Sequence, residues 1–388
     1  MATESGSLLT AYVHCGRDAL HDLKTEWLRL EAMSSQAVLF QSHAWCRTAA
    51  DVMDPEALAD IRVFTVSGPT GLVALLPMRL QRKRGRVVLT GLAEPFQEFT
   101  DMLLDPQVNA ELAYGFIHAE ILKQKADYLH LGQVRLDSNL ARGIAGRVPT
   151  GGEQESAPYV QLSAFSNFAE YLPTVRSKTR KNMRNMKNVL QRTAPLTHAV
   201  TRTAQETAPL VDRIYENRSR WLQERGLNSS SFDDEAFRTM VRALAQIEGE
   251  AVRPVGMSLR HGDTIIAEMW GFIHNTRYYA YMSSWNKEYS NKGPGRMHLG
   301  FLLEVAFDMD VDSAEFMIPA VPYKMTWATH EMVANDHLLP MTLIGQLYVR
   351  GWVDFARPRV KALAYAMSDG MRRNIWSAVN AVRGRKAA

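Results

Sequence analysis

The amino-acid sequence predicts an α+β protein with a mixed β-sheet, built from two tandem halves. The chain has 388 residues, which is enough for two domains of ordinary size. Short segments with strand and helix periodicity follow one another along its whole length. The second half shows a strand, two helices, three strands, a helix and a strand. The first half contains a shorter version of this order, which indicates a diverged repeat.

The composition is that of a soluble globular protein. Hydrophobic residues make up 46% of the chain and charged residues 22%, and the net charge of +4 is too small to predict general nucleic-acid affinity. The two cysteines, Cys15 and Cys46, cannot form a disulfide framework, and no Cys/His spacing suggests a metal site. The N-terminus lacks a basic signal region, and no apolar run approaches the ~20 residues that span a bilayer. These features predict a cytoplasmic protein.

The first half of the chain contains one predicted α/β unit. Ser42 precedes the helical residues around Trp45, so its side chain is placed to cap a helix there. The basic run at residues 81–86 lies between two predicted strands, which favours a solvated hairpin turn over a nucleic-acid site. Residues 148–158 are rich in Gly, Glu, Gln and Pro, and this composition predicts a linker. We expect helices at residues 17–33 and 110–124, and strands at residues 61–66, 72–79, 86–90 and 128–133.

The second half begins with the most basic helix of the chain, predicted at residues 167–191. Seven Arg and Lys residues between Arg176 and Arg192 form either a solvated face or a site for anionic groups such as phosphates. Later in this half, three strands joined by short turns predict an antiparallel meander. We expect strands at residues 159–162, 198–203, 255–260, 265–274 and 278–284, and helices at residues 206–225, 233–247 and 297–309.

The chain ends in a predicted long basic helix that starts at residue 357. Apolar residues recur on one face of this helix, and Arg and Lys occupy the others. Packing across the two halves is its expected role, and contact with a membrane surface is the alternative.

Residues 265–327 contain the strongest indication of chemistry. Two strands are followed by a glycine turn at residues 291–296, a helix, and the segment P-Y-K-M-T-W, which we expect to form a strand. Gly293 and Gly295 leave backbone N–H groups open at a helix start, where they suit a pyrophosphate, and Arg296 adds a positive charge. The turn matches neither a Rossmann fingerprint nor a Walker loop. Splayed strands beside it would receive the pantetheine arm of coenzyme A by backbone pairing.

Six segments, taken in order, resemble the GNAT acyltransferase superfamily. They are F-Q-S-H-A-W, G-L-V-A-L-L-P-M-R-L, S-K-T-R-K-N-M-R, I-I-A-E-M-W-G-F, Y-S-N-K-G-P-G-R and P-Y-K-M-T-W, and the resemblance covers residues 30–327. More narrowly, they are similar to the CelD/BcsL-type acetyltransferases of bacterial exopolysaccharide clusters, and distantly to the Fem peptidoglycan ligases. The sequence departs from this family at Glu315 and Pro319, which stand where the family has an Asp and a Gly before its Pro-Tyr-Lys.

The resemblance implies two tandem GNAT-like domains, of which the second carries the cofactor site. The expected divisions are an N-terminal GNAT-like domain at residues 1–157, an acyltransferase domain at residues 158–349, and a basic C-terminal helix at residues 350–388. The implied donor is an acyl-CoA, above all acetyl-CoA, and no metal is expected. The implied acceptor is an amine on a small molecule or on a lipid- or nucleotide-linked sugar, for cell-envelope or exopolysaccharide synthesis. Such an enzyme would be cytoplasmic, with peripheral contact to the inner membrane as an option.

Acyl transfer to an amine deprotonates the amine, polarises the thioester carbonyl and protonates the leaving thiolate. Glu268 lies in mid-strand among apolar residues, where a carboxylate is costly unless it is used or paired, so it is the first candidate for general base, with a structural role as the alternative. Tyr281 and Tyr323 are candidates to protonate the thiolate, and Lys324 is a candidate to bind a phosphate or a carboxylate. The other candidates are Ser283, Trp285, Gly293, Gly295, Arg296 and His298 for the cofactor, and Arg180, Lys181 and Trp270 for the acceptor.

Two other functions stay open at this point. A Fem-like ligase would use aminoacyl-tRNA, with the basic helix at residues 176–192 and the C-terminal helix as the RNA-binding elements. The chain lacks the long helical hairpin insertion that some Fem proteins carry, and no other nucleic-acid partner is expected. A GNAT-like protein without catalytic activity would bind a partner or a membrane through residues 357–385.

Overall fold

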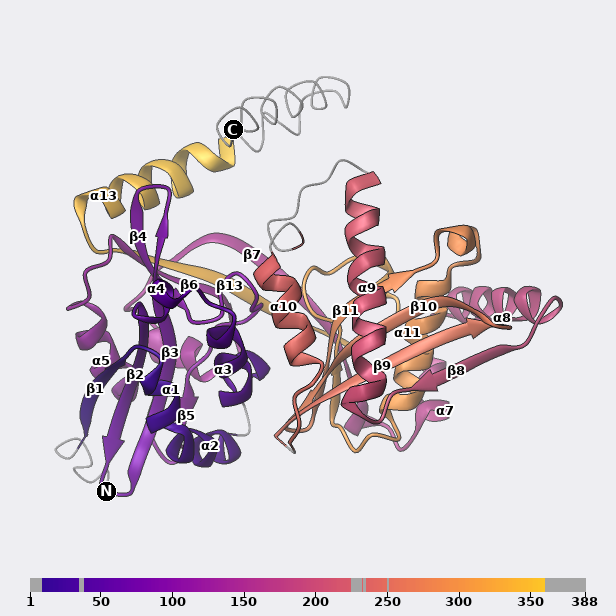
Figure 1. The fold of residues 1–388 in the computed structure, drawn as a ribbon, viewed down its shortest axis with the longest axis horizontal. Helices are drawn as coiled ribbons and strands as arrows, with labels where there is room; N and C mark the ends of the chain where they lie inside the picture. The colour runs from indigo at the N-terminus through magenta and orange to yellow at the C-terminus, as the bar shows by residue number, and fades with distance from the viewer. Residues whose placement is uncertain (1–8, 35–37, 225–231, 233–234, 250, 360–388) are drawn as a thin grey trace.

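The computed structural model describes residues 9–34, 38–224, 232, 235–249 and 251–359. A single mixed sheet of 13 strands runs through this part of the chain, and helices cover its faces (Figure 1). The strands are β1 (Thr10–Cys15), β2 (Ile61–Gly68), β3 (Gly71–Lys83), β4 (Arg86–Gly91), β5 (Leu103–Leu104), β6 (Tyr128–Arg135), β7 (Thr150–Gln161), β8 (Leu196–Val200), β9 (Val252–His261), β10 (Thr264–His274), β11 (Arg277–Trp285), β12 (Ser313–Glu315) and β13 (His330–Pro340).

The helices are mostly short and amphipathic, and the longest within the described ranges is α9. No helix in the described ranges is both long enough and apolar enough to cross a membrane. The helices are α1 (Asp18–Asp22), α2 (Lys24–Met33), α3 (His43–Asp51), α4 (Pro55–Leu58), α5 (Ala110–Ile121), α6 (Asn139–Ile144), α7 (Phe168–Tyr171), α8 (Ser177–Gln191), α9 (Ala204–Glu224), α10 (Glu235–Leu244), α11 (Pro294–Ala306), α12 (Pro322–Met325), α13 (Leu343–Gln346) and the wider helix η6 (Leu347–Ala356).

The two halves of the sheet exchange one strand each. The order is β1-β2-β3-β4-β6-β13-β7-β12-β11-β10-β9-β8, with β5 beside β3. Strand β7 leaves the N-terminal half and pairs with β12 of the C-terminal half, while β13 returns from the C-terminal half and pairs with β6. Each half also contains one parallel pair next to the exchanged strand, β4 with β6 and β11 with β12. This repeated arrangement agrees with the predicted α+β fold of two tandem halves.

The linker predicted at residues 148–158 is wrong, because most of this segment belongs to strand β7. Its Gly, Glu and Gln residues lie at partly exposed positions, whereas Ala157 and Val160 are buried. The strand is held by pairing with β13, from His330 opposite Tyr159 to His337 opposite Thr150. Because β13 lies far away in the sequence, the composition of residues 148–158 could not indicate that they pair with it.

Most other predicted elements are confirmed, with shifted ends. The Ser42 side chain accepts a hydrogen bond from the Trp45 backbone N–H and caps α3 as expected, and the meander is β9, β10 and β11. Two elements differ in kind. The helix predicted at residues 167–191 is interrupted around Pro173, because α7 ends at Tyr171 and α8 begins only at Ser177. The segment P-Y-K-M-T-W contains helix α12 in place of a strand, with Pro322 at its first position.

Two helix layers cover opposite faces of the meander. Helices α9 and α10 pack Leu210, Ile214 and Phe237 against Trp270 and Phe272 on one face. Helix α11 packs Leu299 and Leu302 against Met269 and Tyr278 on the other. Figure 1 shows α9 crossing in front of these strands. The predicted C-terminal helix is described only as far as residue 359, and the rest of that prediction lies outside the described residues.

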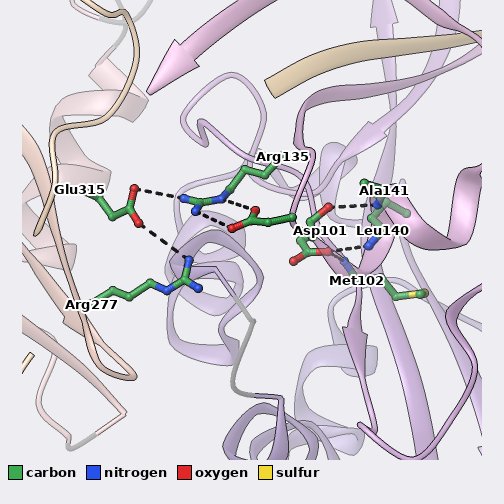
Figure 2. Close-up of polar contacts among 9 residues, drawn as sticks. Asp101, Met102, Arg135, Leu140, Ala141, Arg277 and Glu315 are labelled. Carbon is green, nitrogen blue, oxygen red and sulfur yellow. Dashed lines mark hydrogen bonds and ion pairs between the residues drawn. The ribbon is translucent and has the colours of Figure 1, made fainter. Parts of the chain in front are cut away.

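A buried ion network joins the two halves beside β7. The Glu315 carboxylate lies 3.2 Å from the Arg135 guanidinium and 3.8 Å from that of Arg277, and Arg135 also forms two 3.0 Å contacts with Asp137. Figure 2 shows Glu315 between the two arginines. Nearby, the buried Asp101 carboxylate accepts hydrogen bonds from the backbone N–H groups of Met102 and Leu140. Glu315 is one of the two positions at which the sequence departs from the family pattern. In the structure, its ion pair with Arg135 links β12 to β6.

The Asp101 carboxyl group should make the stability of the protein depend on pH. Burial raises the pKa of Asp101 to about 7, from 3.8 in an exposed carboxyl group. The folded protein holds this proton more tightly than the unfolded chain, so stability is lost as the pH rises from about 4 to about 7. We expect Asp101→Asn to remove this slope, so that the unfolding free energy of the variant rises by a few kcal/mol relative to that of wild type as the pH increases over this range. Urea unfolding at several pH values measures it.

Asp105→Asn serves as the matched control for the Asp101 experiment. Its carboxylate is also buried and accepts one backbone N–H, that of Gln107, at 2.9 Å. If the unfolding free energies of wild type and Asp101→Asn change in parallel with pH, Asp101 is not the group responsible for the slope, whatever the absolute stability of the variant.

Candidate active site

A cavity of about 490 Å³ opens where strands β11 and β12 diverge. The two strands pair in parallel only from Arg277 opposite Ser313 to Tyr279 opposite Glu315. Beyond Tyr279, β11 continues to Trp285 while the other chain turns away from it. The wall of the cavity contains Pro95, Phe96, Gln97, Glu98, Arg218, Trp221, Phe232, Phe237, Met269, Ala280, Tyr281, Met282, Ser283, Trp285, Leu299, Phe316, Met317, Ile318, Pro319, Val321, Tyr323 and Lys324.

A β-bulge in the meander lies directly behind this opening. The register of β10 against β11 shifts between Trp270 and Phe272, so two residues of β11 face Gly271 alone. A Cβ atom built on Gly271 would lie 1.9 Å from the Tyr279 carbonyl oxygen. Because two backbones cannot approach so closely with a side chain between them, this position requires glycine.

The N-terminal half contributes Glu98 to the cavity, and sequence reasoning missed it. Residues 95–98 follow β4 and reach across to the C-terminal half. The Glu98 carboxylate accepts a hydrogen bond from the Ile318 backbone N–H at 3.1 Å. Burial raises the pKa of this carboxyl group, and the positive charge of Lys324 offsets part of the effect. The segment E-P-F-Q-E-F contains no local motif, so only its position in space identifies the residue.

Lys324 contacts the same stretch of the cavity rim as Glu98. Its Nζ atom donates hydrogen bonds to the carbonyl oxygens of Met317 at 3.0 Å and Pro319 at 3.2 Å, and lies 3.5 Å from that of Ile318. Burial lowers the pKa of this ammonium group. Its donors are directed at the protein's own backbone, so the geometry favours a role in shaping the rim over one in binding a phosphate.

The two candidate tyrosines differ in how their hydroxyl groups are engaged. The Tyr281 hydroxyl donates to the Phe96 carbonyl oxygen at 3.2 Å, and its ring packs edge-on against Trp45 and Trp270. The Tyr323 hydroxyl has no hydrogen-bond partner within the described ranges, and burial raises its pKa. Both rings line the cavity, and Tyr323 is the one whose hydroxyl can still donate a proton.

Glu268 and Trp270 lie on β10 but do not line the cavity. The Glu268 carboxylate receives a forked pair of hydrogen bonds from Arg213 of α9, at 2.6 Å from Nη2 and 3.1 Å from Nε. Burial raises the pKa of Glu268, while the Arg213 contact lowers it in part. Trp270 is fully buried behind Tyr281. These positions agree with the structural alternative for Glu268 and give Trp270 no direct contact with a ligand.

The glycine turn forms the start of helix α11, close to the end of β11. Gly293 has a φ of 61°, a left-handed conformation that favours glycine. Pro294 carries no N–H group, and no side chain caps the helix. The N–H groups of Arg296 and Met297 donate to the Gly293 carbonyl oxygen, so the Gly295 N–H is the donor that this turn presents to an anion. Gly295 lies against the Trp285 indole, which reaches the cavity wall. Arg296 is exposed, and Ser283 lines the cavity further along β11.

The remaining cofactor candidate, His298, faces the core. Its side chain is 1% exposed and packs near Phe301. Burial lowers its pKa to about 3, so the imidazole is neutral. It lies one turn into α11 on the side away from the cavity wall, and the structure does not bring it together with the other candidates.

Arg180 and Lys181 lie on helix α8, which packs beside α11 at some distance from the cavity wall. Met183 of α8 contacts the core under α11, and the Met186 sulfur lies 3.0 Å from a Cβ built on Gly293. The basic side of α8 points to solvent beside the glycine turn. This position suits an anionic group bound near the start of α11 better than a group inside the cavity.

The corresponding opening in the N-terminal half is filled by its own chain. Strands β4 and β6 pair in parallel only at Val88 and Leu89 and then diverge. The amide of Gln97 lies within 2.7 Å of a Cβ built on Gly91, and the Glu94 carboxylate lies 2.9 Å from one built on Gly132. The loop that fills this opening is the same loop that carries Glu98 into the other one.

The match to a known family falls on the C-terminal half. Residues 177–325 match the family model described as an acetyltransferase (GNAT) domain. The matched range starts at α8 and ends at α12, so it contains the meander, the glycine turn and most of the cavity wall. This part of the chain is therefore similar to GNAT acetyltransferase domains.

Solved structures share the fold over most of the chain. A structure of FemX gives a TM-score of 0.57 at 9% identity and covers 84% of this chain and 97% of its own. A protein of unknown function from Bacteroides thetaiotaomicron gives 0.51 at 10%, with 82% and 97% covered. The C-terminal domain of a putative lysylphosphatidylglycerol synthetase from Agrobacterium fabrum gives 0.50 at 11%, with 87% and 98% covered. The comparison with curated proteins found no match.

Proposed function

We propose that this protein is an N-acyltransferase that uses an acyl-CoA, above all acetyl-CoA, as donor. The observation that carries the proposal is the cavity between the diverged strands β11 and β12, next to a helix start that presents the Gly295 backbone N–H. The free edge of β11 beyond Tyr279 suits the amide groups of a pantetheine arm. The proposed acceptor is an amine on a small-molecule, nucleotide-linked or lipid-linked sugar for envelope or exopolysaccharide synthesis, as the CelD/BcsL resemblance implies.

In the proposed reaction the neutral amine attacks the thioester carbonyl, an N–C bond forms, and the C–S bond breaks. Glu98 accepts the proton lost from the amine, because it is a cavity carboxylate whose raised pKa brings it toward neutral pH. Tyr323 donates a proton to the leaving thiolate. We assign the base to Glu98 in place of Glu268, since the Glu268 carboxylate is occupied by Arg213.

Acetyl-CoA is expected to raise the melting temperature of the wild-type protein, and Gly295→Asp is expected to abolish this effect. A Cβ at this position meets only Trp285 at 3.9 Å, and an acidic residue suits a helix start, so the variant should fold. Its carboxylate would repel the pyrophosphate. Differential scanning fluorimetry measures both effects, with Gly295→Ala as the uncharged control.

A Fem-like ligase that uses aminoacyl-tRNA is the second candidate, supported by the FemX-like fold and the basic helix α8. It predicts tRNA binding that weakens steeply with salt, because phosphate contacts release counterions. If no acyl-CoA stabilises the protein and tRNA binds in this way, the second candidate replaces the first. Membrane contact through the C-terminal basic residues stays a separate proposal.

A further inference from the structure

Arg218 is a half-buried cation in the cavity wall without an ionic partner. It projects from α9, with its guanidinium carbon 5.6 Å from the centre of the Trp221 ring. Within the described ranges no carboxylate lies within ion-pair distance of it, whereas Arg213 on the same helix is paired with Glu268. Burial lowers the pKa of Arg218. A desolvated guanidinium without a partner carries a free-energy cost that a bound anion would remove.

The other two charged groups of the cavity wall are already engaged. Lys324 donates to backbone carbonyl oxygens of the rim. Glu98 accepts one backbone N–H through one carboxylate oxygen and is the site's proposed base. Of the two cations in this wall, Arg218 is therefore the one whose hydrogen-bond donors have no partner among the described residues.

Arg218 belongs to the helix that packs on the face of the meander opposite α11. Helix α9 packs on the face of the meander that carries Trp270 and Phe272. Helix α11, whose first turn would hold the donor's phosphates, packs on the other face. An anion at Arg218 is thus expected to belong to the acceptor.

Aromatic rings line the wall on the same side of the meander as Arg218. The rings of Phe96 and Phe237 lie with their centres 5.1 Å apart, and both line the cavity. Trp221 and Trp285 add two indoles at a ring distance of 6.4 Å. Such a surface suits the flat, apolar side of a sugar or another ring.

We propose that the acceptor carries an anionic group, a carboxylate or a phosphate, which Arg218 binds while the amine faces Glu98. This inference rests on the proposed acyl-transfer function and narrows its acceptor to one class, amines that also bear a negative charge. A guanidinium forms two parallel hydrogen bonds with either kind of anion, so both sources share the same recognition chemistry.

Steady-state acetyl transfer to matched acceptor pairs tests the inference. Glucosamine 6-phosphate against glucosamine probes the phosphate, and phenylalanine against 2-phenylethylamine probes the carboxylate. Wild type should prefer the anionic member of at least one pair. Arg218→Gln should raise the KM for that member by roughly 10- to 100-fold and leave the KM for the neutral member and for acetyl-CoA unchanged. Arg218→Lys should restore part of the loss, and the exposed Arg220→Gln on the same helix is the control.

Two results would overturn the inference while leaving the proposed function intact: no preference for an anionic member in either pair, or an equal effect of Arg218→Gln on both members. If wild type acetylates no amine, the proposed function fails. In that case the inference is tested separately, by calorimetric titration of the protein with glucosamine 6-phosphate and with phenylalanine. Saturable binding that Arg218→Gln abolishes supports it, and the absence of binding overturns it.

Discussion

Replacing Glu98 with glutamine is expected to lower kcat by roughly 10²- to 10⁴-fold, the range over which a positioned general base accelerates a reaction. The glutamine oxygen can still accept the Ile318 N–H, so the rim of the cavity should keep its shape. Acetyl-CoA should therefore stabilise the variant as it stabilises wild type. Initial rates of CoA release, together with scanning fluorimetry, measure both quantities.

The pH profile provides a second readout of the same residue. Because burial raises the pKa of Glu98, the acidic limb of kcat/KM in wild type should lie above the range of an ordinary carboxyl group. Protonation of the base removes activity as the pH falls through this pKa. In Glu98→Gln that limb should disappear from the residual activity.

Glu268→Gln distinguishes the two carboxylates. This substitution weakens a buried contact with Arg213, so it should lower stability and change kcat much less than Glu98→Gln does. The opposite result, a large loss in kcat at position 268 and none at position 98, would return the base to Glu268.

Arg135→Met should destabilise the protein by about 3–5 kcal/mol, the cost of removing one partner from a buried ion pair. Both side chains of the Arg135–Glu315 pair are 2% exposed, so water cannot replace the lost contact (Figure 2). The chain that follows Glu315 forms the cavity rim at Phe316 and Met317. We therefore expect weaker acetyl-CoA binding in the same variant. Urea unfolding measures the first effect and fluorimetry the second.

Two further variants separate the buried charge from general loss of packing. Arg277→Met removes the more exposed guanidinium, 3.8 Å from Glu315, and should cost less. The double variant Arg135→Met with Glu315→Leu removes both buried charges and should recover most of the stability. If the double variant is as unstable as the single one, the ion pair is not the cause.

Much of the secondary structure of the C-terminal half could be predicted from the sequence alone. Alternating apolar residues and short turns predicted the meander, because strand periodicity and turn chemistry act between neighbouring residues. The same holds for the Ser42 cap and for the glycine turn at Gly293, where the hydrogen bond or the backbone conformation depends on residues within one helical turn. The α+β fold with two similar halves also followed from the order of these local elements.

Only the tertiary structure decided which residues meet at the cavity. Glu98 bonds to Ile318 across 220 positions, and Glu268 meets Arg213 across 55. Strand β7 has the composition of a linker and becomes a strand because β13 returns to pair with it. Sequence patterns report forces between near neighbours, whereas these contacts depend on how whole strands and helices pack. For that reason the sequence indicated the glycine turn of the proposed donor site, and the structure added Glu98, the proposed base, and Arg218, the proposed contact for the acceptor.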